Sequence, residues 1–153
     1  MRQIQDVVLK EISVEIAKSK DAIVAFLDAP MDFEQLKVVP GLFDTAKGGM
    51  RIIGVDHAAR LIYAASQYIS NDLLQRNEAP KQQDLDNIAD VISSIEYYLE
   101  AVRENRANTE AILALTEQSL RNLGYQPDSV VAESAPVAVE PANANPDIVE
   151  LSV

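Results

Sequence analysis

The apolar residues of this chain recur at helical spacing in five segments, which prolines, glycines and capping residues separate. No segment alternates apolar and polar residues, the pattern of a half-buried strand. The connections are short, so successive helices should be antiparallel neighbours. Aromatic residues make up only 5% of the chain, so aliphatic side chains and alanine must build the core. The sequence therefore predicts an all-α fold, an up-and-down antiparallel bundle of five helices.

Prolines and glycines set the expected bounds of the first two helices. The first is expected over about residues 3–28, because Pro30 follows it. The second is expected to begin at an N-cap on Asp32 and to end at a left-handed cap on Gly54. Pro40 lies inside this second segment and lacks a backbone N–H, so it should kink the helix or divide it.

The remaining three helices are bounded by similar signals, namely acidic or amide caps at their starts and glycine or polar residues at their ends. Their expected ranges are 56–77, capped by Asp56, then 84–104, opened by Asp84 or a near neighbour, and 109–124, opened by Asn108 or Thr109 and closed by Gly124.

The composition changes at Pro127. Residues 127–153 contain four prolines and five acidic residues, but no Lys, Arg or Gly. Such a stretch cannot bury enough apolar surface to offset the entropy lost on ordering. We therefore expect a helical bundle over 1–126 and a disordered acidic linker over 127–153.

Charge and composition exclude several classes of function. A net charge of −11 would repel nucleic acid and anionic membrane surfaces. The chain has no cysteine, so it can form neither a disulfide nor a thiolate metal site. No apolar run approaches the roughly 20 residues that span a bilayer, and no signal peptide is visible. These features favour a cytoplasmic protein that is not inserted in a membrane.

The run Asp44-Thr45-Ala46-Lys47-Gly48-Gly49-Met50-Arg51-Ile52-Ile53-Gly54 resembles the motif of histidine phosphotransfer (HPt) domains. In that family the pattern is His-x-x-Lys-Gly, followed by small residues and a Gly that ends the helix. Lys47, Gly48, Gly49 and Gly54 fall into this register, and Asp44 occupies the position of the phospho-accepting His. The resemblance therefore implies a degenerate HPt domain that has lost its acceptor.

The resemblance extends over about residues 3–125, with the helix order of chemotaxis-type phosphotransfer domains. The runs 41–54 and 96–100 are similar to the tandem HPt-like domains of hybrid kinases that control type IV pili and twitching motility, and to related scaffold proteins without kinase activity. The resemblance implies protein partners, namely a receiver domain, a kinase domain or a polar scaffold protein. These partners would bind around Asp44, Lys47, Gly48 and Arg51. No catalytic residue is expected in this domain, although the parent protein would be a kinase or a scaffold.

Other interpretations of the motif residues stay open. Asp44 is expected to pair with Lys47 on an exposed helix face, or to mimic a phosphorylated His. His57, the single histidine, is an alternative acceptor, although a surface His without a catalytic role is the usual explanation. Thr45 points to another face and is expected to be structural. Gly48 and Gly49 suit a helix crossing better than a phosphate loop, because no Walker pattern surrounds them.

Neither a metal nor a cofactor is expected. A di-metal carboxylate bundle requires Glu-x-x-His pairs from two helices, and the chain has one histidine. The leading hypothesis is thus a docking or scaffold module. The alternatives are an active phosphotransfer domain that uses His57 or another residue, and a structural dimerisation bundle.

Overall fold

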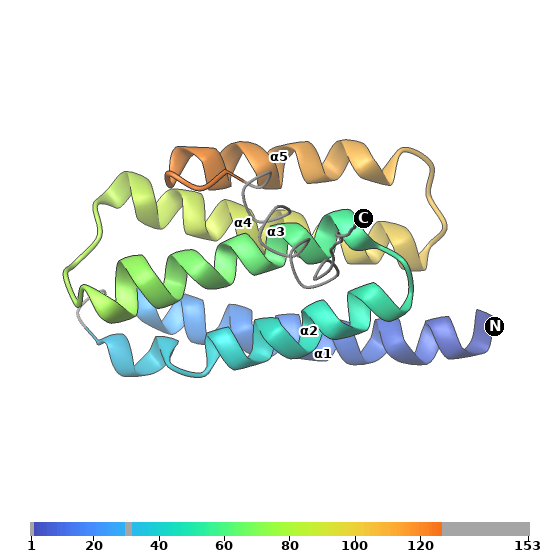
Figure 1. Ribbon diagram of the computed structural model, residues 1–153, viewed down its shortest axis with the longest axis horizontal. Helices are drawn as coiled ribbons and strands as arrows, with labels where there is room; N and C mark the ends of the chain where they lie inside the picture. The colour runs from blue at the N-terminus through green and yellow to red at the C-terminus, as the bar shows by residue number, and fades with distance from the viewer. Residues whose placement is uncertain (1, 30–31, 127–153) are drawn as a thin grey trace, which may run out of the picture.

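The computed structural model describes residues 2–29 and 32–126, which form helical segments joined by short connections (Figure 1). In chain order these are α1 (Arg2–Asp28), the 3₁₀ segment η1 (Phe33–Leu36), α2 (Val39–Ile52), α3 (Asp56–Gln67), the π-helical segment η2 (Tyr68–Gln75), α4 (Gln82–Arg103) and α5 (Thr109–Asn122). The described ranges contain no strand. Because η2 continues α3, five long helices run up and down, and the predicted all-α bundle is confirmed.

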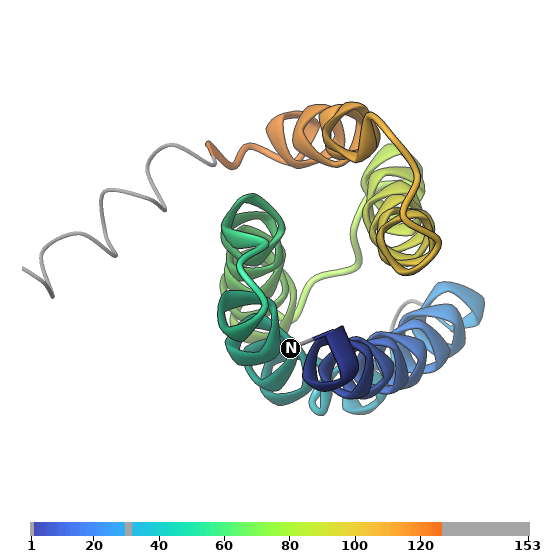
Figure 2. The ribbon, with the colours of Figure 1, turned by 90° about the vertical axis from the view of Figure 1, so that its right-hand side faces the viewer.

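The five helices surround one core, in the order α1, α2, α3, α5, α4 around the bundle (Figure 2). The α1–α2, α2–α3 and α4–α5 pairs pack extensively, whereas α1 with α4 and α3 with α5 touch less. The molecule is thus a layer of α1, α2 and α3 that faces a hairpin of α4 and α5.

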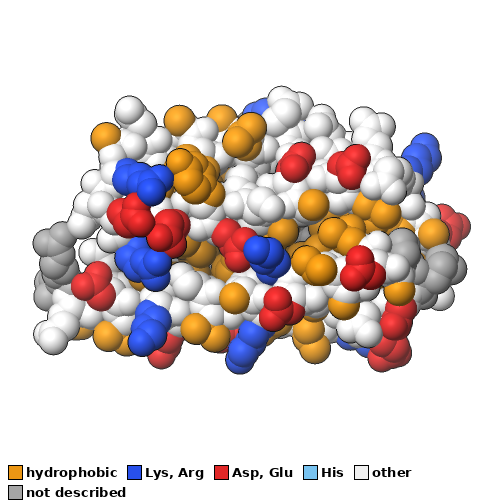
Figure 3. Space-filling model, turned by 180° about the vertical axis from the view of Figure 1, so that it is seen from behind, with side chains coloured by type: hydrophobic (Ala, Val, Ile, Leu, Met, Phe, Trp, Pro, Cys, Tyr) orange, Lys and Arg blue, Asp and Glu red, His pale blue; other side chains and the backbone are white. Residues whose placement is uncertain are grey.

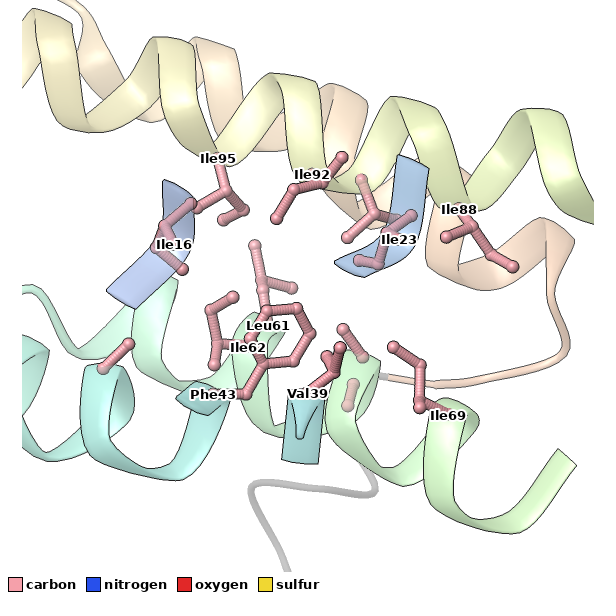
Figure 4. Close-up of a cluster of buried hydrophobic side chains, with 14 of the residues drawn as sticks. Ile16, Ile23, Val39, Phe43, Leu61, Ile62, Ile69, Ile88, Ile92 and Ile95 are labelled. Carbon is pink, nitrogen blue, oxygen red and sulfur yellow. The ribbon is translucent and has the colours of Figure 1, made fainter. Parts of the chain in front are cut away.

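Branched aliphatic side chains from both parts meet in the core (Figure 4). The side chains that converge there include Ile16, Ile23, Val39, Phe43, Leu61, Ile62, Ile69, Ile88, Ile92 and Ile95. Leucine, isoleucine and valine have few rotamers, so a core built from them specifies one packing.

Pro40 divides the segment that was expected as the second helix. The 3₁₀ segment η1 ends at Leu36, and α2 begins at Val39 with Pro40 in its first turn. In that turn the backbone N–H has no partner within the helix, so its absence costs nothing. Asp32 is the N-cap residue, as predicted, but of η1 rather than of a continuous second helix. Its side chain makes no cap hydrogen bond, and Oδ2 instead accepts a hydrogen bond from Gln35 Nε2 at 3.2 Å.

Asp56 is the first residue of α3 rather than its N-cap, which is Val55. The predicted cap at Asp56 is therefore wrong by one position. Its carboxylate lies in the first turn, where it interacts favourably with the helix dipole. Asn108, by contrast, precedes α5 in a left-handed conformation (φ 60°), and α5 begins at Thr109 as expected.

The predicted glycine caps are confirmed. Gly54 has φ +82°, and Val55 N donates to Met50 O at 2.9 Å. Gly124 has φ +93°, and Tyr125 N donates to Leu120 O at 2.9 Å. Both ends are Schellman caps, in which a left-handed residue lets the chain satisfy the last helical carbonyls.

The third and fourth helices differ from the sequence prediction, the third in its type of helix and the fourth in its first residue. The expected third helix is α-helical only to Gln67, and the π-helical segment η2 follows it to Gln75. The fourth begins at Gln82, two residues before Asp84. None of the helices in the described ranges is long and apolar enough to cross a membrane. The predicted linker over 127–153 lies outside the described residues.

Candidate functional site

The outer face of α2 presents the motif residues. Val39, Phe43, Ala46 and Met50 are buried at spacings of four, three and four residues, which fixes the inner face of this helix. Asp44, Gly48 and Arg51 therefore fall on the opposite, exposed face. We call this surface the α2 face, and it comprises Asp44, Lys47, Gly48 and Arg51.

Lys47 lies at the edge of the α2 face and is held by two contacts. Its Nζ is 3.3 Å from Asp44 Oδ1 and 4.6 Å from the centroid of the Tyr63 ring on α3. The Lys47 side chain is 18% exposed, whereas that of Asp44 is 75% exposed. The predicted Asp44–Lys47 pair is thus present, although such an exposed pair stabilises by only about 0.3–0.5 kcal/mol.

Tyr63 was not predicted as part of this site. It lies on the next helix, and it is partly buried against the core. An ammonium group over an aromatic ring at this distance is a cation–π contact, which contributes about 0.5–1 kcal/mol at exposed sites. The contact orients Lys47, so its charge is presented at a fixed place on the α2 face.

The two adjacent glycines have different surroundings. A Cβ atom on Gly48 would meet nothing within 4 Å, so the surface beside Asp44 is open. A Cβ atom on Gly49 would lie 2.8 Å from Ile12 Cγ1, because α1 and α2 approach each other closely there. The expected helix crossing is confirmed at Gly49, whereas Gly48 leaves room for a partner. Thr45 donates its hydroxyl to Gly41 O at 3.2 Å, which suits a structural role.

His57 lies away from the α2 face, in the first turn of α3. Its Nδ1 is 2.6 Å from Glu110 Oε1 and its Nε2 is 2.6 Å from Glu117 Oε2, both on α5. The side chain is 25% exposed. His57 therefore bridges two helices, rather than presenting a ring nitrogen to a phosphoryl donor. Sequence reasoning missed both glutamates, although their spacing of seven residues places them on one face of α5.

The charge of His57 follows from its partners. Partial burial lowers its pKa, but the hydrogen bonds and negative charges of Glu110 and Glu117 raise it by more, so the pKa lies above its usual value of 6.5. Both ring nitrogens face carboxylates, and only the imidazolium form can donate from both.

Among the described residues, no three His, Asp or Glu side chains are grouped so that they could hold a metal ion.

Comparison with known proteins places this bundle among its relatives. The family model described as "FimL C-terminal domain" matches residues 1–120. The scaffold protein FimL of Pseudomonas aeruginosa is 32% identical over 119 residues, which are 77% of this chain and 21% of that protein. The chain thus spans about a fifth of the length of this curated relative. No solved structure matches the chain. Because the family model covers most of the sequence, the chain belongs to the FimL C-terminal domain family.

Proposed function

We propose that this chain is a docking module of a scaffold protein that regulates type IV pili, and that it is an HPt-like domain without a phospho-acceptor. The observation that carries the proposal is the α2 face itself. It keeps Lys47 and Gly48 in the phosphotransfer pattern, it presents Arg51 on the same face, and it has a carboxylate at the acceptor position. The similarity to a protein named as a scaffold supports the same role.

The chemistry of the α2 face suits binding better than phosphoryl transfer. A carboxylate accepts a phosphoryl group only where a metal ion and supporting acids surround it. Asp44 has Lys47 as its ion-pair partner, and no acidic metal site was found among the described residues. The α2 face is therefore an open surface with two cations, the oriented Lys47 and the exposed Arg51. Such a surface complements the acidic phosphorylation site of a receiver domain.

Binding measurements with charge-reversed variants test the docking surface. The candidate partners are receiver domains, kinase domains and polar scaffold proteins from a pilus-regulating system. Arg51→Glu and Lys47→Glu should each weaken binding by about tenfold or more, because a repulsive charge replaces an attractive one. Lys37→Glu is the matched control, since Lys37 is exposed and lies outside the α2 face. Unchanged affinity of both variants for every candidate would rule out this surface.

Steric variants provide a second test of the same surface. Gly48→Leu should weaken binding without unfolding the domain, because nothing lies within 4 Å of a Cβ atom at this position. Circular dichroism would verify that the helices are retained. An unchanged affinity in this variant would mean that the partner does not approach Asp44.

The loss of phosphotransfer is tested by intact mass. The native chain, incubated with a phosphorylated kinase or receiver from a pilus-regulating system, should gain no phosphoryl group. Asp44→His should gain one if the surrounding surface still accepts the donor. A phosphoryl group on the native chain that is lost in His57→Gln would contradict the proposal and identify His57 as the acceptor.

A further inference from the structure

Helix α1 carries two seams of heptad spacing on opposite sides. The inner seam is buried in the core, and its residues follow one another at alternating steps of three and four; they are Leu9, Ile12, Ile16, Ser19, Ile23 and Phe26. The outer seam repeats the same steps two residues earlier; its residues are Val7, Lys10, Val14, Ala17, Asp21 and Val24. Residues two positions apart in an α-helix are rotated by about 200° around the helix axis, so the outer seam faces away from the core.

The outer seam is exposed along the whole helix. Val7 is 57% exposed, Val14 45% and Val24 44%. Within the described part of the chain, no ion pair or hydrogen bond engages Lys10 or Asp21. Figure 3 shows this side of the molecule, with α1 in its lower half, where hydrophobic side chains are interspersed with acidic and basic ones. Val7, Val14 and Val24 are β-branched, as are many residues that pack in helix–helix seams.

The order of residues in the outer seam is complementary to itself when reversed. If a second α1 lies antiparallel across a two-fold axis near the middle of the seam, Val7 faces Val24 of the second copy. In the same register Lys10 faces Asp21, and Val14 faces Ala17. Each contact occurs twice, so the seam would contain six pairings, of which two join opposite charges and four join apolar residues, and none joins like charges. A parallel alignment would instead place Lys10 against Lys10 and Asp21 against Asp21.

We propose that the outer seam of α1 is a homodimer interface in which two copies pack their α1 helices antiparallel. The reversed charge order selects a second copy of this chain as the occupant, because a partner must place an acid opposite Lys10 and a base opposite Asp21. The outer seam is separate from the proposed docking surface, because the seam lies on α1 and the α2 face lies on another helix. Gly49 of α2 meets Val8 and Ile12, which lie outside the outer seam, so α2 packs against a different side of α1.

The first test is the oligomeric state of the 153-residue chain by sedimentation equilibrium over a series of concentrations. A dimer whose population grows with concentration is expected. Lys10→Glu and Asp21→Lys should each shift the dissociation constant upward by about tenfold or more, because like charges then face each other twice. The double variant that exchanges the two charges should restore dimerisation. A monomer at every concentration, or a double variant as weak as the single ones, would overturn the proposal.

The orientation is tested by cysteine cross-linking, which is unambiguous because the native chain has no cysteine. A mixture of Val7→Cys and Val24→Cys chains should form the mixed disulfide under mild oxidation, whereas Val7→Cys alone should not. Cross-linking of Val7→Cys to itself without the mixed product would show a parallel arrangement and overturn the antiparallel register.

The charge-reversed variants at Lys10 and Asp21 need a control for the change of net charge. Lys81→Glu is this control, because Lys81 precedes α4 and lies off the seam.

Discussion

At the scale of single residues, alanine substitutions at two neighbouring glycines, Gly48 and Gly49, should have different effects on packing. Replacing either glycine by Ala improves helix propensity by about 1 kcal/mol. At Gly48 the new methyl group meets nothing within 4 Å, so Gly48→Ala should stabilise the domain. At Gly49 it meets Ile12 Cγ1 at 2.8 Å, and overpacking costs about 1–3 kcal/mol. Urea unfolding should therefore rank Gly48→Ala above Gly49→Ala in stability by about that overpacking cost. Equal stability would mean that α1 shifts to accept the methyl group.

A buried hydroxyl pair gives a second prediction at this scale. Ser94 Oγ and Thr116 Oγ1 are 2.6 Å apart between α4 and α5, and both residues are buried. Ser94 also donates to Val91 O at 3.0 Å, so Thr116 is the donor of the shared bond. Ser94→Ala and Thr116→Val should each lower the free energy of unfolding by about 1 kcal/mol, because each leaves the other buried hydroxyl without the shared hydrogen bond. The double variant should lose less than the two single losses together. If the losses in this double-mutant cycle were strictly additive, the two hydroxyls would not be coupled.

Local contacts could be predicted from the sequence at this scale, and distant ones could not. The Asp44–Lys47 pair and the cap at Gly54 depend on residues three to five positions apart, so helical geometry alone indicates them. Tyr63 and Glu117 reach their partners only after the chain has folded back. No spacing rule connects His57 to residues 53 and 60 positions later.

At the scale of helices, His57 links α3 to α5. The α3–α5 contact is small, and His57 is held there by Glu110 and Glu117. The matching loose contact, between α1 and α4, is bridged by Lys20 Nζ and Glu96 Oε1 at 3.1 Å. Charged pairs thus join the α1–α2–α3 layer to the α4–α5 hairpin where neighbouring helices touch least.

The His57 bridge should make stability depend on pH. Because the folded pKa is raised, the bridge contributes fully below the unfolded value near 6.5, and this contribution is lost as pH rises through the folded pKa. The difference in free energy of unfolding between the native chain and His57→Gln should therefore shrink with rising pH above 6.5. The single imidazole should also titrate by NMR above 6.5 in the folded chain. A midpoint below 6.5 would show that burial outweighs the two glutamates.

The bounds of elements were predictable where a residue forbids a helix, and less so elsewhere. Pro40 cannot donate a backbone bond, so a division there followed from its chemistry. Asp32 is an N-cap without a side-chain cap hydrogen bond, and Val55 rather than Asp56 is the N-cap of α3, because a capping side chain needs a specific backbone geometry as well as an oxygen. The π-helical segment η2 was also missed, since apolar spacing hardly distinguishes its turns from α-helical ones.

At the scale of the whole molecule, the sequence predicted the five-helix bundle but not the order of helices around it. Short connections indicate antiparallel neighbours, and α1–α2, α2–α3 and α4–α5 follow that rule. The link between α3 and α4 departs from it, because α5 packs beside α3 instead. This departure brings His57 to α5, so the missed bridge and the missed helix order have one cause.

The proposed dimer and the proposed docking surface together predict bivalent binding. Two copies joined through α1 would each present an α2 face, and linked sites raise apparent affinity without new contacts. Lys10→Glu should therefore weaken binding to a surface densely coated with partner, while binding to a monovalent partner in solution stays unchanged. Arg51→Glu should weaken both. Surface plasmon resonance at high and low partner density, paired with solution titration, separates the two effects. Weakening of the solution affinity by Lys10→Glu would instead place the outer seam of α1 within the partner's own footprint.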